Sequence, residues 1–437
     1  MKQLHLAALL LAPLAALHAA DAPKPAKPNI LFILADDLGI ECLSSYGGRD
    51  HSTPNIDRLA AQGMQFSYCF SNPFCSPSRA SLLTGRYPFK NGLVEVLANS
   101  DQENTYLSPQ QPSFARQLKA AGYATAIAGK WHVSLLHKHN TINAFGFDQY
   151  QVWQIFDTQG NKTQRFWTPH INRNGTLLAE VIKEQYGPDL DVKFLTDFIA
   201  ANAAQKKPFL AYFSTPLPHY PWEPTPDSKD SSYRIPHNEH KGDPQYFPDM
   251  VRYLDKCIGK LLKALDDQGI ADHTIVIFLA DNGTDRDLKN RWGEEGKILK
   301  GGKGTMTDRG THVPLLVRWP NKIKAGTTCE DLIDFSDVLP TLCDMSGTPM
   351  PTEAIHGRSF YPQLLGKPGT PRTWVHVQHM KNRHIRDREF ILNNANELRH
   401  VVETGMSESN PIQKKSANEK EQAARQRLQA VFDELGK

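Results

Sequence analysis

Cysteines are scarce in this sequence of 437 residues. Neither charge is in clear excess, and no internal repeat is visible. Six cysteines are too few to crosslink a chain of this length, so the fold must depend on a hydrophobic core. The 50 basic and 47 acidic residues leave a formal net charge of only +3, which gives no reason to expect a nucleic-acid partner. A hydrophobic share of 40% is that of an ordinary globular protein, large enough for one big domain or two.

Long hydrophobic runs are missing beyond the N-terminus. A positively charged start is followed by an apolar stretch over 6–17 and by small residues that end at Ala20. This pattern is typical of a secretory signal peptide, and the stretch is too short to span a membrane. We therefore expect a signal peptide over 1–20 that is cleaved near Ala20, a Pro- and Lys-rich tether over 21–28, and a secreted or periplasmic protein without a membrane span.

A phosphate-binding P-loop is also missing. The pair Gly129-Lys130 has no glycine five residues earlier and no Ser or Thr after it, and Gly302-Lys303 fails the same test. The sequence thus gives no support for nucleotide binding by this route.

Short apolar runs alternate with amphipathic helices along most of the chain. Such runs are typical of parallel strands that are buried on both faces. They lie at 29–34, 123–128, 208–213, 274–279 and 313–318. The alternation predicts an α/β fold with a large, mostly parallel central sheet flanked by helices. Residues 133–190 and 286–304 show weak periodicity, and we predict loops there.

The pattern changes after residue 365. Two short strands are followed by an amphipathic helix over 418–435. We therefore expect a main α/β domain over 29–365 and a smaller C-terminal α+β subdomain over 366–437.

Four of the predicted strands are followed by charged or hydrogen-bonding residues. These are Asp36 and Asp37, Lys130 and His132, His219, and Asp281 with Asn282. Each group alone has an ordinary explanation, such as a helix cap or a surface histidine. Ligands of open parallel sheets bind outside the carboxyl ends of the strands, however, and four such turns at one edge indicate a common site.

Hard oxygen ligands dominate this group. They come from Asp36, Asp37, Asp281 and Asn282. Because no soft ligand accompanies them, they favour Ca²⁺ or Mg²⁺ over zinc. Basic side chains would offset the remaining negative charge and hold an anionic substrate, and the candidates are Arg79, Lys130 and Lys303.

One cysteine lies in an unusual context. Cys75 just precedes a predicted helix in which Pro77 occupies the first turn and Gly85 marks the end. The free N–H groups of a helix N-terminus favour an anion, and Arg79 can reach the same place. By itself, this pattern favours a structural cysteine beside a surface arginine.

The run Cys75-Ser-Pro-Ser-Arg79, followed by Leu83-Thr-Gly-Arg86, resembles the signature of the type I sulfatases of the alkaline phosphatase superfamily. The resemblance spans roughly residues 28–365. It includes, in the same order, Asp-Asp after the first strand, Gly-Lys-Trp-His, Pro-His, Asp-Asn-Gly, and Lys-Gly-Thr before Val-Pro. It implies a sulfatase in which a maturation enzyme converts Cys75 to formylglycine, whose hydrate is the nucleophile.

The resemblance also implies a metal site. Formylglycine at position 75 would ligate Ca²⁺, with Mg²⁺ as the alternative, together with Asp36, Asp37, Asp281 and Asn282. The metal lowers the pKa of the nucleophile, and a hydrate can expel its sulfate without attack by water on sulfur.

The remaining roles follow from the same resemblance. Asp281 would help to deprotonate the hydrate, and His219 with Lys303 would stabilise the leaving oxygen. His132 would take the proton whose removal expels sulfate. Arg79 and Lys130 would bind the nucleophile and the sulfate oxygens.

Two segments depart from the family pattern. Asp308-Arg-Gly-Thr-His312 stands where members often have Glu-Gly-Gly-x-Arg, and Leu398-Arg-His-Val401 where Leu-Tyr-Asp-Leu is usual. These differences affect the identity of the substrate more than the chemistry. Export and the aromatic and basic residues of expected loops favour a sulfated sugar or polysaccharide. Those residues are Trp153, Trp167, Trp222, Arg291 and Trp292.

Three other functions are compatible with the same residues. The first is a phosphonate or phosphate ester hydrolase that uses the same formylglycine. The second is a metal-independent cysteine hydrolase that pairs Cys75 with His219. The third is a secreted anion- or glycan-binding protein whose cysteine is never modified.

Overall fold

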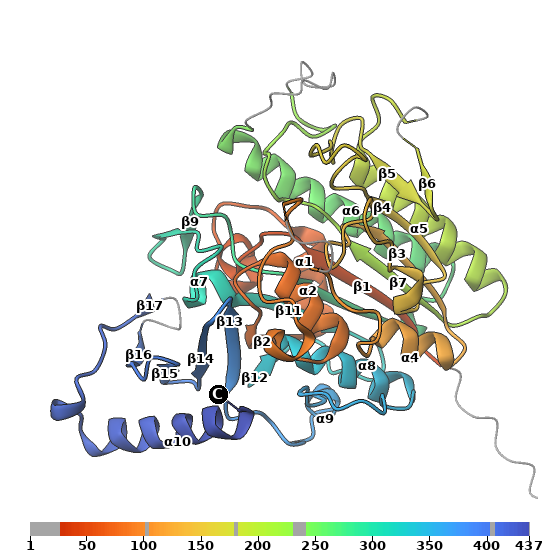
Figure 1. The fold of residues 1–437 in the computed structure, drawn as a ribbon. Coiled ribbons are helices and arrows are strands. Elements are labelled where there is room, and N and C mark those ends of the chain that lie inside the picture. Colours follow the sequence, from red (N-terminus) through yellow and green to blue (C-terminus); the bar gives the residue numbers. More distant parts are fainter. Residues whose placement is uncertain (1–26, 101–104, 179–181, 230–241, 403–406, 437) are drawn as a thin grey trace, which may run out of the picture.

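The computed structural model describes residues 27–100, 105–178, 182–229, 242–402 and 407–436. The expected signal peptide and most of the tether lie outside the described residues. A large sheet with helices on both faces forms the body of the molecule, and a small sheet with one long helix stands beside it (Figure 1). Within the described ranges, no helix has both the length and the hydropathy that a membrane crossing needs.

The central sheet has ten strands. In spatial order they are β12 (Thr327–Asp334), β2 (Met64–Phe70), β11 (His312–Arg318), β8 (Thr274–Ala280), β1 (Asn29–Ala35), β7 (Phe209–Ser214), β3 (Ala124–Gly129), β4 (Gln149–Trp153), β5 (Ile171–Arg173) and β6 (Thr176–Leu177). Strands β11 and β5 run against the others. The predicted mostly parallel α/β sheet is therefore confirmed.

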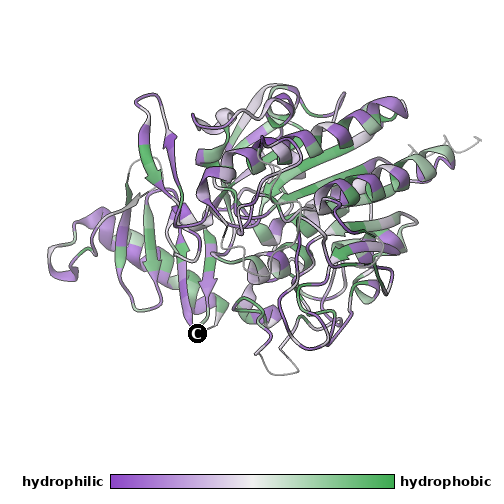
Figure 2. Cartoon of the chain, turned by 90° about the horizontal axis from the view of Figure 1, so that it is seen from above, coloured by the Kyte–Doolittle hydropathy of each residue, from purple (hydrophilic) through white to green (hydrophobic). Residues whose placement is uncertain are grey.

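The central strands are buried along their whole length. Every residue of β1, β7 and β8 is buried, as expected for apolar runs covered on both faces. Figure 2 shows these strands as hydrophobic and the surrounding helices as mixed. This core gives the sheet a rigid edge from which polar side chains can project.

Helices cover the sheet in two layers. One layer contains α1 (Pro54–Gln62), α5 (Gly187–Ala204) and α6 (Phe247–Asp267), and the other contains α2 (Cys75–Thr84), α4 (Phe114–Ala120) and α8 (Val338–Ser346). The short helices are α3 (Pro88–Asn91), α7 (Asp308–Thr311) and α9 (Tyr361–Leu364). Helix α6 is strongly amphipathic, and its apolar stripe from Val251 to Leu265 is buried as the spacing predicts.

Several sequence predictions were wrong in detail. The segment 133–190 contains strands β4 to β6, and 286–304 contains the hairpin of β9 (Lys289–Trp292) and β10 (Lys297–Lys300) rather than a plain loop. Strand β11 is antiparallel to its neighbours, which an apolar run alone does not reveal. All six cysteines are free.

The C-terminal region forms a second, antiparallel sheet. Its strands are β13 (Val375–His379), β14 (Asn382–Arg386), β15 (Phe390–Asn393), β16 (Leu398–Val402) and β17 (Ser407–Glu408). Helix α10 (Glu419–Leu435) packs Leu428 and Phe432 against a small separate core that includes Ile385 and Leu392. The smaller α+β unit of the predicted fold is thus present.

Candidate active site

The polar residues predicted to gather at one sheet edge do lie there. Ala35 at the end of β1 is in register with Ala280 at the end of β8, so Asp36 and Asp281 leave the sheet side by side. Ser214 ends β7 opposite Gly129 of β3, which brings the following Lys130 to the same edge. Parallel register therefore positions Asp36, Lys130 and Asp281, which come from distant parts of the sequence.

A glycine allows the closest of these approaches. Gly129 has φ of 105°, and a Cβ atom there would lie 2.0 Å from the carbonyl oxygen of Ser214. The backbone N–H of Lys130 donates to that same oxygen at 2.6 Å. The Arg79 guanidinium binds both strands, since its Nη1 donates to the Lys130 carbonyl at 3.1 Å and to Ser214 Oγ at 2.6 Å.

Each buried carboxylate faces a basic side chain. Lys130 Nζ donates to Asp36 Oδ2 at 2.7 Å, and Lys303 Nζ donates to Asp37 Oδ2 at 2.6 Å. Arg79 Nε donates to Asp281 Oδ2 at 2.9 Å. The three acids are at most 1% exposed, so these pairs neutralise charge that would be costly to bury alone.

The carboxylates differ in their acidity. Burial would raise the pKa of Asp36, but the charges of Lys130 and Arg79 hold that pKa well below its usual range. Burial raises the pKa of Asp37, against the opposing effect of Lys303. Burial also raises the pKa of Asp281 well above its usual range, and the charge of Asp36 adds to this increase. One firmly ionised acid thus stands beside two that hold protons more readily.

The site has the features that a divalent cation requires. Asp36 Oδ1 and Asn282 Oδ1 are buried and accept no hydrogen bond within the described chain. Asn282 Nδ2 donates to Asp37 Oδ1 at 2.8 Å, so the amide turns its free oxygen away from that carboxylate. One ligand atom each of Asp36, Asp37 and His219 lie within 4.8 Å of one another. Unpaired hard oxygen atoms in a buried acidic cluster fit Ca²⁺ or Mg²⁺.

Cys75 is the first residue of α2 and is only 2% exposed. Its Sγ atom lies 3.2 Å from Nδ1 of His132. Because Nε2 of His132 is 3.0 Å from the Leu97 carbonyl oxygen, Nε2 carries the proton and Nδ1 is the free acceptor. Burial and the charge of Lys130 lower the pKa of His132 well below its usual range, so this histidine is neutral and its Nδ1 is a hydrogen-bond acceptor.

His219 lies on the opposite side of the site. Its Nε2 is 3.0 Å from Lys303 Nζ, and its Nδ1 contacts the carbonyl oxygen of Tyr220. Burial and the charge of Lys303 lower the pKa of His219 well below its usual range. The pKa of Lys303 is raised, because the charge of Asp37 outweighs the effect of burial. Lys303 therefore carries the proton between these two side chains, and its Nζ donates a hydrogen bond to Nε2 of His219.

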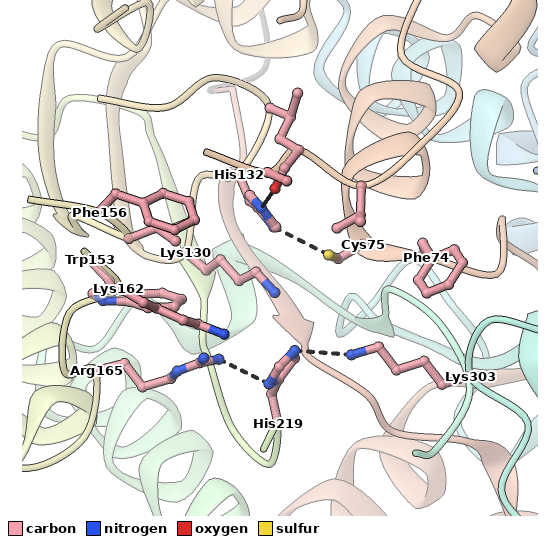
Figure 3. Close-up of a pocket in the computed structure, with 14 residues that line it drawn as sticks. Phe74, Cys75, Lys130, His132, Trp153, Phe156, Lys162, Arg165, His219 and Lys303 are labelled. Carbon is pink, nitrogen blue, oxygen red and sulfur yellow. Dashed lines mark hydrogen bonds between the residues drawn. The ribbon is translucent and has the colours of Figure 1, made fainter. Parts of the chain in front are cut away.

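A pocket of about 340 Å³ opens over these groups. Cys75, Lys130, His132, His219 and Lys303 contribute to its wall, as Figure 3 shows. The rest of the wall is mostly apolar and includes the aromatic side chains of Phe74, Trp153 and Phe156. The structure thus joins the predicted nucleophile, both histidines and two of the predicted cations in one cavity. The chemical role of each residue stays a prediction.

Some predicted contacts are absent from the pocket. Arg79 contacts the carboxylates beneath the cavity but is not among the lining residues. Of the five residues expected in substrate loops, Trp153 lines the pocket from the end of β4, whereas Trp167 and Trp222 belong to the hydrophobic core. Arg291 and Trp292 lie in β9 and do not line this pocket. Composition alone could not separate core tryptophans from those of a cavity.

Two basic residues of the wall were not predicted. Lys162 and Arg165 lie between β4 and β5, in a segment without periodicity. Arg165 is only 4% exposed, and its guanidinium lies 4.0 Å from the centre of the Trp153 ring. A basic residue among aromatics, as in Gln-Arg-Phe-Trp, was the available signal, but it is a weak one.

Comparison with known proteins identifies the family. A family model described as Sulfatase matches residues 28–348. The chain belongs to the sulfatase family. The resemblance noted from the cysteine signature is therefore confirmed, and the chain is a sulfuric ester hydrolase.

The relatives of this sulfatase include several named enzymes. It is 34% identical to arylsulfatase A of Homo sapiens, over 79% of this chain and 69% of that protein. It is 31% identical to N-acetylgalactosamine-6-sulfatase of Canis lupus familiaris, over 83% and 70%, and 30% identical to steryl-sulfatase of Rattus norvegicus, over 90% and 76%.

Solved structures show the same fold. The crystal structure of Ps i-CgsB in complex with k-i-k-neocarrahexaose aligns with a TM-score of 0.76 at 25% identity, and the alignment covers 94% of this sulfatase and 92% of that chain. Membership of the family implies a formylglycine and a divalent metal, and the cluster of Asp36, Asp37 and His219 offers a place for the metal.

Proposed function

We propose that this sulfatase is secreted and hydrolyses a sulfate ester of a sulfated sugar or polysaccharide, using formylglycine derived from Cys75. A divalent cation would be held by Asp36, Asp37, Asp281 and Asn282. One observation carries the proposal: Cys75 lies in the wall of a cationic pocket, next to a neutral histidine and above unpaired carboxylate and amide oxygens.

Formylglycine and the divalent cation would each have a defined task. Formylglycine would supply a hydrate hydroxyl as the nucleophile, and the cation would supply positive charge that favours its ionised form. The chain itself provides the binding of sulfate. Lys130 and Lys303 both line the pocket, and each ammonium can donate to a sulfate oxygen while it keeps its carboxylate partner.

Proton transfer can be assigned to two sides of the pocket. On one side, Nδ1 of His132 is an acceptor 3.2 Å from the side chain at position 75 and can take a proton from it. On the other side, the Lys303 ammonium and Nε2 of His219 are 3.0 Å apart and share one proton. A leaving oxygen beside this pair would receive a proton from the Lys303 ammonium as its bond to sulfur breaks.

A sugar fits the rest of the cavity. Phe74, Trp153 and Phe156 give it apolar walls, on which the C–H faces of a sugar ring can pack. Among similar proteins, Ps i-CgsB was crystallised with k-i-k-neocarrahexaose, and another relative is named N-acetylgalactosamine-6-sulfatase. These names support a sulfated carbohydrate as the substrate of this chain.

Mass spectrometry of the Cys75 peptide tests the nucleophile. Protein made in its native host should carry an aldehyde at position 75 in place of the thiol. An unmodified thiol in active enzyme would contradict the proposal and favour a cysteine hydrolase. The same preparation should have lost residues up to about Ala20, which N-terminal sequencing checks.

Turnover of a substrate panel tests the reaction. Sulfated sugars should be cleaved faster than para-nitrophenyl sulfate, and both faster than para-nitrophenyl phosphate or a phosphonate ester. Faster cleavage of the phosphate or phosphonate esters would instead favour the related hydrolases of the superfamily.

Removal of divalent cations should abolish turnover. Without the cation, Asp36 Oδ1 and Asn282 Oδ1 would have no partner within the described chain, and the positive charge that favours the ionised nucleophile would be lost. We expect dialysis against EDTA to reduce the rate at least 100-fold. Adding back Ca²⁺ and Mg²⁺ separately identifies the metal. Full activity after exhaustive chelation would contradict the metal site.

A further inference from the structure

The basic groups around the pocket fall into two classes. Arg79, Lys130 and Lys303 each lie within 4 Å of a carboxylate oxygen. Arg165 and Lys162 have no such ion pair within the part of the chain that the structure describes, although both line the pocket. Arg165 is buried, and a cation that is buried without a direct anionic partner is costly, so its pairing is expected from a ligand. Lys162 is exposed and adds a second positive charge at the pocket wall.

Arg165 is held firmly in this unpaired state. Its guanidinium stacks on Trp153, and its backbone is fixed by the start of α5. The Gly187 N–H donates to the carbonyl of Phe166 at 2.7 Å, and a Cβ at Gly187 would lie 2.3 Å from the Arg165 carbonyl oxygen. The closeness that glycine permits here holds the backbone of Arg165 against the start of α5.

The contact of Arg165 with His219 does not satisfy the guanidinium. Nη1 of Arg165 is 2.9 Å from Nδ1 of His219, and Lys303 Nζ is 3.0 Å from Nε2. A neutral imidazole has only one acceptor nitrogen, and two cations compete for it. Since Nδ1 also contacts the Tyr220 carbonyl, it is the donor, and Arg165 keeps N–H groups for another acceptor.

Lys162 approaches from the same side. Phe156 and Lys162 form a β-bridge that closes a turn, and the Asp157 N–H donates to the Asn161 carbonyl at 2.9 Å within it. Figure 3 shows the Lys162 and Arg165 side chains entering together from one side, opposite Phe74 and Lys303. Partial loss of solvent, together with the charge of Arg165, lowers the pKa of Lys162 to about 8.

We infer that Lys162 and Arg165 form a second anion-binding subsite, and that the preferred substrate carries a further sulfate or carboxylate group beside the ester that is cleaved. This inference rests on the proposed function, because it takes the reactive sulfate to lie at Cys75 and Lys130. Glu223, Asp36 and Asp37 act on Arg165 only from a distance, and the further anion would supply the direct ion pair. It names the substrate class as a multiply charged sugar, such as a disulfated sugar or a sulfated uronic acid.

The experiment compares matched substrates. For each ring position, kcat/KM is measured on a sulfated neutral sugar, on the same sugar with a second sulfate, and on the corresponding uronic acid sulfate. The wild-type enzyme should prefer one of the doubly charged members at least tenfold. The preference should shrink as salt increases, since exposed charges are screened. Of the two doubly charged substrates, the one with the higher kcat/KM shows whether the further anion is a sulfate or a carboxylate.

Two variants test the residues. Lys162→Gln should reduce the preference about tenfold through KM for the doubly charged sugar, while the rate on the neutral sugar changes less than threefold. Arg165→Gln should remove most of the preference. Lys193→Gln, which changes an exposed lysine of α5, is the control and should keep the preference of the wild type.

The outcomes separate this inference from the proposed function. If sulfated neutral sugars are cleaved as fast as the charged ones, or if both variants keep the wild-type preference, the second subsite is refuted and the sulfatase assignment stands. If Arg165→Gln slows all substrates equally, Arg165 only supports His219, and the inference fails as well. If no sulfate ester is cleaved, the proposed function itself is wrong.

Discussion

Cys75 differs from the other cysteines in where it lies within the fold. Cys343 is also fully buried, but it lies within α8, and burial raises its pKa to about 12. Cys75 begins a helix, contacts His132 and opens onto a pocket. Two buried cysteines therefore have opposite expectations for reactivity.

The first prediction concerns this pair. Cys75→Ala should reduce turnover of para-nitrophenyl sulfate at least 1000-fold, because the nucleophile is lost. Cys343→Ala should keep the rate of the wild type and lower stability by about 1 kcal/mol through the small cavity. Thermal unfolding of both variants checks that they fold. Substantial activity in folded Cys75→Ala would contradict the proposed nucleophile.

Single residues could be predicted where they follow a strong pattern. Asp36, Asp281 and Lys130 each come directly after an apolar strand, and strand ends meet at one edge. Arg165 and Lys162 could not be predicted, because their place depends on how a long connection folds back over the pocket. Whether a guanidinium lacks a direct anionic partner can be judged only once its neighbours in the structure are known.

At the scale of elements, the end of β3 is tightly packed against β7. Gly129 and Gly122 flank this strand, and both have positive φ, of 105° and 92°. A side chain at Gly129 would collide with β7, whereas nothing lies within 4 Å of the corresponding atom at Gly122. Both glycines therefore allow a positive φ, but only Gly129 also allows close packing against β7.

The second prediction uses these two glycines. Gly129→Ala should move Lys130 away from Asp36 and reduce kcat/KM at least 100-fold, with a clear loss of thermal stability. Gly122→Ala should cost only about 1 kcal/mol, from the strain of positive φ, and should leave turnover unchanged. Equal effects of both changes on activity would show that the crowding at β7 is unimportant.

Helix α5 contains a buried acid without a charged partner in contact. Asp191 is 4% exposed and accepts a hydrogen bond from Gln151 Nε2 at 2.9 Å. Burial raises its pKa to about 7, although Gln151 opposes the shift. The folded chain keeps this proton to a higher pH than the unfolded chain, whose aspartates titrate near 4, so stability falls as the pH rises from about 4 to 7.

The third prediction follows from that sign. Asp191→Asn should raise the unfolding midpoint by several degrees at pH 8 and have little effect at pH 4, because the stability lost is roughly 1.4 kcal/mol per pH unit in between. Asp197→Asn, an exposed change on the same helix, should show no such pH dependence. Unfolding midpoints of both variants and the wild type, measured from pH 4 to pH 8, test this prediction.

The elements themselves were predictable where burial was complete. The strands around β1 form continuous apolar runs and were found within a residue or two. The sequence does not predict β2, because polar and apolar residues mix within it, or the edge strand β12, because its first half is polar. The direction of β11 depends on tertiary contacts that no local pattern contains.

At the scale of the whole molecule, the small sheet supports the pocket. The Phe74 ring, part of the pocket wall, packs against His379 of β13 with ring centres 4.9 Å apart. Arg386 of β14 forms a buried ion pair with Asp308 of α7, and that helix follows the Lys303 loop directly. The C-terminal unit therefore holds two sides of the cavity in place.

The fourth prediction tests this link. Arg386→Gln should destabilise the protein by about 3–5 kcal/mol, because Asp308 is left buried without its partner. It should also lower kcat/KM, through movement of the Lys303 loop. Arg388→Gln removes an exposed ion pair with Glu330 and should cost at most about 1 kcal/mol. Denaturant unfolding and turnover are measured on both variants. Similar stability losses would refute the structural role of the buried pair.

The seclusion of Cys75 has a consequence for timing. Its side chain is 2% exposed, within a cavity of about 340 Å³ that can admit a sugar but not the catalytic surface of another protein. If Cys75 is converted to formylglycine as proposed, the enzyme that oxidises the thiol would have to reach it before the polypeptide folds. A molecule that folded first would keep its thiol, so the active fraction of a preparation would depend on the relative rates of oxidation and folding.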